Sequence, residues 1–126
     1  MDYYSEIEVN GIEISIIVVR MGNDLNVSIY GGHKPHIGAV AISIPRQSLC
    51  DTSKTSSSTS VICVNGHKED RLAYDIATRI SATLNKVITV SCGIHIDCAT
   101  YSTIGSIIQG SNKLVEEFLE RYYEKS

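Results

Sequence analysis

The dipeptide Asn10-Gly11 stands between two runs of alternating polar and apolar residues, and it constrains the start of the fold more than any other feature. Both residues tolerate positive φ, so the pair is a preferred centre for the two-residue turn that joins antiparallel strands. The alternation over residues 6–9, and again from Ile12, predicts strands with one buried and one exposed face. The chain is therefore expected to begin as a β-hairpin.

The remaining periodicity predicts four more strands and two helices. Strands are expected over residues 25–30, 37–44, 61–64 and 86–92, with Pro45 ending the second of these. Apolar residues at helical spacing predict helices over 67–85 and 102–123, and Gly110 leaves open a break in the second. The fold class is α+β: an antiparallel β-sheet meander, then strand-helix-strand-helix, with both helices on the sheet in a single domain, residues 1–126.

A serine- and threonine-rich stretch at residues 51–60 is the only low-complexity segment. It predicts a surface loop, because such a run buries too little apolar area to order itself. A flap that closes its hydroxyl groups over a polar ligand is the alternative, since long loops are often functional.

Composition excludes several classes of partner. The net charge is −3 and no lysine/arginine cluster exists, which argues against nucleic acid and anionic membranes. No apolar run approaches the roughly 20 residues that span a bilayer, and the N-terminal residues lack the pattern of a signal peptide. We expect a cytoplasmic protein with four free thiols, of which Cys63 and Cys92 are core residues in strands and Cys98 lies nearer the site.

All four histidines lie close to glycines, at expected boundaries between elements. In an extended segment His95 and Asp97 point the same way, so they present an imidazole and a carboxylate together. This donor pair suits a divalent metal ion, and His36 and His67 would add two further imidazoles. We expect these turns to converge on one pocket; the alternative is that each histidine is hydrogen-bonded to its own neighbours.

The expected helix start at Gly66-His67-Lys68 is a candidate anion site, because free backbone N–H groups and the helix dipole favour negative charge there. Glu69 and Asp70 would repel a bare phosphate unless a cation lay between them. A phosphate together with a metal ion therefore fits better than a phosphate alone.

These motifs resemble one small family. The succession His36-Ile37-Gly38, a serine-rich segment, Gly66-His67-Lys68-Glu69-Asp70, Gly93-Ile94-His95-Ile96-Asp97 and an isoleucine-rich helix is similar to the prenylated-flavin chaperone-like family, typified by the small D subunit of gallate decarboxylase. The resemblance spans roughly residues 30–115. It implies a fold like that of proteasome-assembly chaperones and, usually, a homodimer.

The resemblance also implies a non-catalytic protein that binds prenylated FMN, or FMN, with a divalent metal ion and serves a prenylated-flavin-dependent decarboxylase. It assigns four residues to the metal: His36, His67, His95 and Asp97. It assigns five to the cofactor: Gly32, Ser58, Ser60, Lys68 and Glu69. Cys98 stands where the family often has a polar residue, which puts a ligand contact at that position in doubt.

Two other functions fit the same residues. One is a small metal-dependent hydrolase, in which Glu69 or Asp70 would deprotonate a metal-activated water. The other is an assembly factor without a small-molecule ligand, which would hold its partner through a sheet edge or the last helix.

Overall fold

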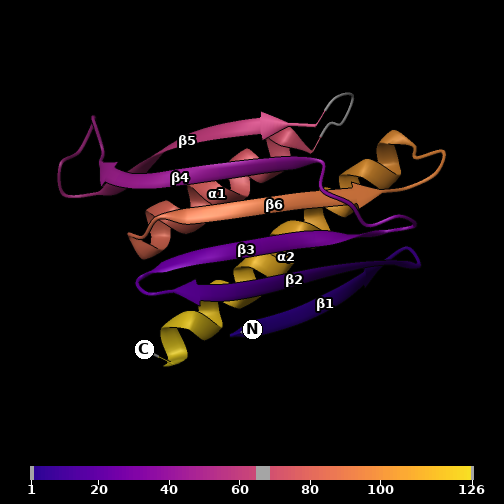
Figure 1. The fold of residues 1–126 in the computed structure, drawn as a ribbon, viewed down its shortest axis with the longest axis horizontal. Coiled ribbons are helices and arrows are strands. Elements are labelled where there is room, and N and C mark those ends of the chain that lie inside the picture. The colour runs from indigo at the N-terminus through magenta and orange to yellow at the C-terminus, as the bar shows by residue number, and fades with distance from the viewer. Residues whose placement is uncertain (1, 65–68, 126) are drawn as a thin grey trace.

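The computed structural model describes residues 2–64 and 69–125, with side chains up to Tyr122. Over these described residues the chain forms six strands and two helices (Figure 1). Their bounds are β1 Tyr3–Val9, β2 Ile12–Met21, β3 Asp24–Gly32, β4 Ala39–Gln47, β5 Thr55–Cys63, α1 Asp70–Leu84, β6 Ile88–His95 and α2 Tyr101–Lys125. The expected α+β class is confirmed.

One mixed sheet has the strand order β1-β2-β3-β6-β4-β5. The hairpin at Asn10-Gly11 forms as expected, with both residues at positive φ. After β3 the antiparallel meander is interrupted, because β6 lies between β3 and β4 and runs parallel to β3. The connection from β3 to β4 must therefore pass the end of β6.

Both helices cover the same face of the sheet, and the other face carries none (Figure 1). α1 packs on β4, β5 and β6, whereas α2 packs on β1 and β2. The core between the layers is built from alternate strand residues, such as Ile14 and Ile16 of β2, and from the apolar stripes of the helices. α2 continues without a break, and Gly110 contacts β1 closely: a Cβ there would lie 2.6 Å from a methyl group of Val9.

Two single residues differ from expectation. Pro45 does not end its strand. β4 pairs with β6 only as far as Ser43, so Pro45 lies where one side of β4 has no neighbour and its missing N–H group breaks no bond. Cys63 is exposed rather than buried, whereas Cys92 is fully buried as expected.

The loop interpretation of residues 51–60 is wrong from Thr55 onward, because this part forms the edge strand β5. Its hydroxyl groups are used at the contact with α1. The Oγ of Ser57 donates to the carbonyl oxygen of Thr78 at 2.9 Å, and the Oγ1 of Thr59 shares a hydrogen bond with the Oγ1 of Thr78 at 2.6 Å. A polar strand can thus be ordered because its buried hydroxyl groups find partners.

Candidate functional site

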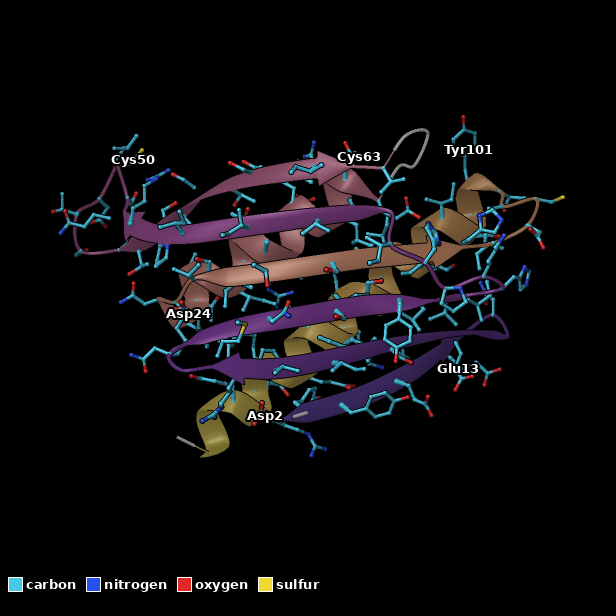
Figure 2. The ribbon with its side chains drawn as sticks, viewed as in Figure 1. Asp2, Glu13, Asp24, Cys50, Cys63 and Tyr101 are labelled. Atoms are coloured by element: carbon cyan, nitrogen blue, oxygen red, sulfur yellow. The ribbon has the colours of Figure 1, made fainter. Side chains whose placement is uncertain are left out.

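The carboxyl ends of the parallel strands β3 and β6 meet at one end of the molecule. β4 begins there, β5 ends there, and both helices start there (Figure 1). Cys63 and Tyr101 mark this end in Figure 2, whereas Asp24 and Cys50 mark the opposite end. In sheets of this kind, residues that follow the strand ends are brought together by topology, and ligands commonly bind there.

The connection from β3 to β4 crosses the end of β6 in close contact (Figure 1). The carbonyl group of His36 lies against the α-carbon of Gly93, where a Cβ atom would collide with it. The N–H group of Gly38 donates to the carbonyl oxygen of Cys92 at 2.8 Å. These contacts fix the backbone that carries His36 over the strand that carries His95.

The start of this connection also depends on glycine. Gly32 has φ +80°, and a Cβ at this position would collide with the carbonyl oxygen of His95. The N–H group of His33 donates to that same oxygen at 2.7 Å. Gly32 was expected to bind the cofactor. In the structure, its lack of a Cβ lets the backbone at the end of β3 approach the backbone of His95 closely.

His36 is held on both sides of its ring. Its Nδ1–H donates to the carbonyl oxygen of Lys34 at 3.0 Å, and its Nε2 lies 3.1 Å from Oε1 of Glu69. The His36 and Glu69 side chains are only 20% and 13% exposed, so this pair is well shielded from water. Glu69 stands at the N-cap of α1 without capping it by its side chain, which extends instead into the space beside Gly38.

His95 and Asp97 form a second, more exposed pair. The Nε2 of His95 lies 3.0 Å from Oδ1 of Asp97. The backbone N–H of Asp97 donates to Nδ1 of His33 at 3.2 Å, so His33 joins the group as well. The rings of His36 and His95 approach edge to face, with centroids 6.2 Å apart. Three imidazoles and two carboxylates therefore gather at this end of the sheet.

Cys92 lies beneath this group and takes no ionic part in it. Burial, and then the negative charge of Glu69, raise the pKa of its thiol to about 12. Metal binding and nucleophilic attack both require a thiolate. Cys92 therefore stays a neutral core residue near neutral pH.

The donor chemistry fits a divalent cation, because imidazole and carboxylate together suit ions such as Zn²⁺, Fe²⁺ or Mn²⁺. In the described part of the chain, however, no three side chains of histidine, cysteine, aspartate or glutamate are arranged to hold such an ion. His36 and His95 instead face carboxylates. The expected ligand His67 and the expected phosphate contact Lys68 lie outside the described residues.

A groove adjoins the pairs on the helix side of the sheet. Its volume is about 340 Å³, and Glu69 and His95 form part of its lining. Apolar side chains from α1, the end of β6 and α2 make most of its walls. At the start of α2, the Oγ1 of Thr100 accepts a hydrogen bond from the N–H of Thr103 at 3.2 Å and caps the helix.

The structure unites four of the nine residues expected in the site. It brings together His36, Glu69, His95 and Asp97. Ser58 and Ser60 are exposed on β5, where Ser58 accepts a hydrogen bond from Nε of Arg46. His33 was not assigned a role from the sequence, although its place in the same glycine-rich stretch as His36 was a usable signal.

A family model described as the prenylated flavin chaperone LpdD-like domain matches residues 8–123. The match covers nearly the whole chain. The chain belongs to this family. It is therefore a prenylated-flavin chaperone domain, as the order of its histidine motifs had indicated.

No curated protein matches the chain. Neither helix, over the residues that the structure describes, is long and apolar enough to cross a bilayer. The family match thus carries the functional assignment, and the geometry of the site determines how far it can be refined.

Proposed function

We propose that this protein binds prenylated FMN without transforming it, with the help of a divalent metal ion, and passes it to a prenylated-flavin-dependent decarboxylase. The observation that carries the proposal is one juxtaposition. His36, His95, Asp97 and Glu69 meet at the end of an apolar groove, in a chain whose family is named for prenylated flavin. A polar end and an apolar cavity suit a ligand that has both a charged and a ring-shaped part.

The metal ion would be held by His36, His95 and Asp97, with His67 as a further candidate ligand. When bound, it would supply positive charge that offsets the carboxylates and favours a negatively charged ligand. The chain's own residues would orient the ligand: the carbonyl oxygen of Lys34 holds Nδ1 of His36, which leaves Nε2, on the side of Glu69, for the ion. The backbone contact at Gly93 fixes that ring beside His95. Lys68, Gly32, Ser58 and Ser60 remain candidates for contacts to the cofactor.

A flavin titration under anaerobic conditions tests this proposal. Reduced prenylated FMN is added to metal-stripped protein with and without Mn²⁺, Fe²⁺ or Zn²⁺, and bound metal is measured on the same preparation. We expect tighter binding with metal, and a loss of at least tenfold in His36→Gln and His95→Gln. Absence of binding in every condition would overturn the proposal.

The same variants separate the two alternative functions. Hydrolysis of a phosphoester or lactone that is lost in His95→Ala would indicate a metal-dependent hydrolase. Capture of the decarboxylase that persists in His36→Gln and His95→Gln, without flavin binding by the wild type, would indicate an assembly factor.

We also propose that the protein acts as a homodimer in the cytoplasm. A group of exposed aliphatic side chains on the helix-free face supports the dimer: Val40, Ile42, Ile44 and Ile62. Such groups on a protein surface often mark interaction sites. The exposed thiol groups of Cys50, Cys63 and Cys98 are consistent with a reducing compartment.

A further inference from the structure

The groove beside the histidines is walled mainly by isoleucines. Ile94 lies near the end of β6 and Ile96 directly follows that strand, whereas Ile104, Ile107 and Ile108 come from the first turns of α2. Leu72 of α1 completes the apolar wall. Glu69 and His95 belong both to this lining and to the histidine–carboxylate pairs, so the groove is continuous with the proposed cofactor site.

Two of these isoleucines are not needed by the core. Ile104 and Ile108 lie one helical turn apart and are 40% and 42% exposed, whereas Ile107 and Ile94 beneath them are 8% and 9% exposed. An apolar surface that faces water inside a groove gains free energy when another apolar group covers it. Ile104 and Ile108 therefore form an exposed apolar wall to which an apolar group of a ligand can bind.

The size of the groove favours a small molecule over a peptide. Its volume of about 340 Å³ is near the lower end of the range for small-molecule sites, roughly 300–1,000 Å³. Two turns of a partner helix, about 10 Å across and 11 Å long, would require a larger cavity. The polar residues Arg71, Asp75 and Asn112 also line it, and the ion pair of Arg71 with Asp75, at 3.2 Å, lies along α1.

We propose that Ile104 and Ile108 receive the apolar ring that prenylation adds to the flavin, and so make the site select prenylated over unmodified FMN. The inference rests on the proposed function and adds the basis of its specificity. Unmodified FMN lacks this ring and would leave the two isoleucines uncovered. Covering two to three methylene equivalents corresponds to a preference of about 10- to 100-fold.

The test compares two ligands on each protein variant. Reduced FMN and reduced prenylated FMN are titrated anaerobically, with the same metal ion, into the wild type and the Ile104→Gln/Ile108→Gln double variant. Glutamine keeps the helical propensity of α2 and removes the apolar wall. Leu49→Gln is the matched control, because Leu49 is 90% exposed and lies between β4 and β5, at the end of the sheet opposite the groove.

We expect the wild type and Leu49→Gln to prefer prenylated FMN by about 10- to 100-fold. The double variant should lose most of that preference, while its Kd for unmodified FMN changes less than about threefold. A preference that survives in the double variant would overturn the inference and leave the proposed function intact. If the wild type binds neither flavin, both the proposed function and the inference that rests on it are wrong.

Thermal unfolding of each variant shows that the comparison is made on folded protein. If the double variant unfolds, the single variants Ile104→Gln and Ile108→Gln carry the test, and each should lose part of the preference. Equal preferences in both single variants and the wild type would then contradict the inference.

Discussion

The carbonyl group of His36 occupies the space beside the α-carbon of Gly93 that any other residue would fill with its Cβ. This contact follows from the strand order, because the chain between β3 and β4 must pass over the end of β6. The obstacle is backbone, which cannot rotate away as a long side chain would. The position of His36 relative to His95 therefore depends on a glycine at position 93.

Gly93→Ala should displace the segment that carries His36 and destabilise the fold by about 1–3 kcal/mol, the usual cost of overpacking. It should also weaken metal-supported flavin binding at least tenfold. Chemical denaturation and the anaerobic titration measure the two effects. Unchanged stability and affinity would show that the crossing segment can move away without consequence.

Two glycines of α2 give a matched pair of stability predictions. A Cβ at Gly105 would meet nothing within 4 Å, whereas a Cβ at Gly110 would lie 2.6 Å from Val9. Gly105→Ala should therefore stabilise the protein by about 0.5–1 kcal/mol through helix propensity. Gly110→Ala should destabilise it by about 1–3 kcal/mol, because β1 must shift. Equal effects in urea denaturation would contradict the close packing of α2 on β1.

Glu69→Gln isolates the charge that faces His36. The amide keeps the shape of the side chain beside Gly38 but removes the negative charge that lies 3.1 Å from Nε2 of His36. We expect the metal-supported flavin affinity to fall about 10- to 100-fold, as is typical when a group next to a metal ligand is changed. Asp24→Asn removes one negative charge at the exposed start of β3, at the opposite end of the sheet, and should leave the affinity unchanged. Equal losses in both variants would assign the effect to general electrostatics.

Local chemistry in the sequence was enough to predict the hairpin and both helices. The expected convergence of His36, His67 and His95 on one pocket stays a prediction, because His67 lies outside the described residues. Asn10-Gly11 acts through its own backbone preferences, and the helical stripes act through spacing alone. The position of β6 between β3 and β4 could not be predicted from local sequence patterns, because strand order depends on which surfaces pack against each other in the folded chain. The role of Glu69 beside His36, and that of Gly93 beneath it, follow from this order and were therefore missed.

The same limit explains the errors over Pro45 and the serine-rich strand. Proline is excluded from a strand only where its missing N–H group would have had a partner, and Ser43 is the last residue of β4 that pairs with β6. Ser57 and Thr59 are tolerated at the helix–sheet contact because Thr78 satisfies their hydroxyl groups. Both facts depend on a neighbouring element that composition does not reveal.

Three of the four cysteines should react with a thiol reagent in the folded protein, and one should not. Cys50, Cys63 and Cys98 are exposed and should react with a chromogenic thiol reagent at pH 8, whereas buried Cys92 should react only after unfolding. A fourth fast thiol in the native protein would contradict the burial of Cys92.

The raised pKa of Cys92 also predicts an alkaline loss of stability. In the folded state the thiol keeps its proton up to a pKa of about 12, against an ordinary value of 9.0. The unfolded chain therefore binds fewer protons above pH 9. The contribution of the buried thiol to the free energy of unfolding is complete below pH 9 and is lost as the pH rises towards 12. In Cys92→Ala, the decline of unfolding free energy between pH 9 and 10.5 should be shallower by up to about 1.4 kcal/mol per pH unit. Parallel declines in the two proteins would show that burial does not hold the proton on this thiol.

The proposed dimer makes a prediction on the helix-free face. Ile42 and Ile62 are 43% and 78% exposed, and they lie on neighbouring strands whose register pairs Val40 with Ile62. Lysine at both positions would place two charges in a dimer interface formed by this face, where they would lose their hydration without gaining partners. We expect sedimentation equilibrium to give a dimer for the wild type and a monomer for Ile42→Lys/Ile62→Lys. Tyr101→Lys is the control, because Tyr101 is 94% exposed at the start of α2 and its replacement should leave the dimer intact. A wild type that is monomeric at all concentrations would remove the homodimer from the proposed function, and a dimer that persists in the double variant would place its interface elsewhere.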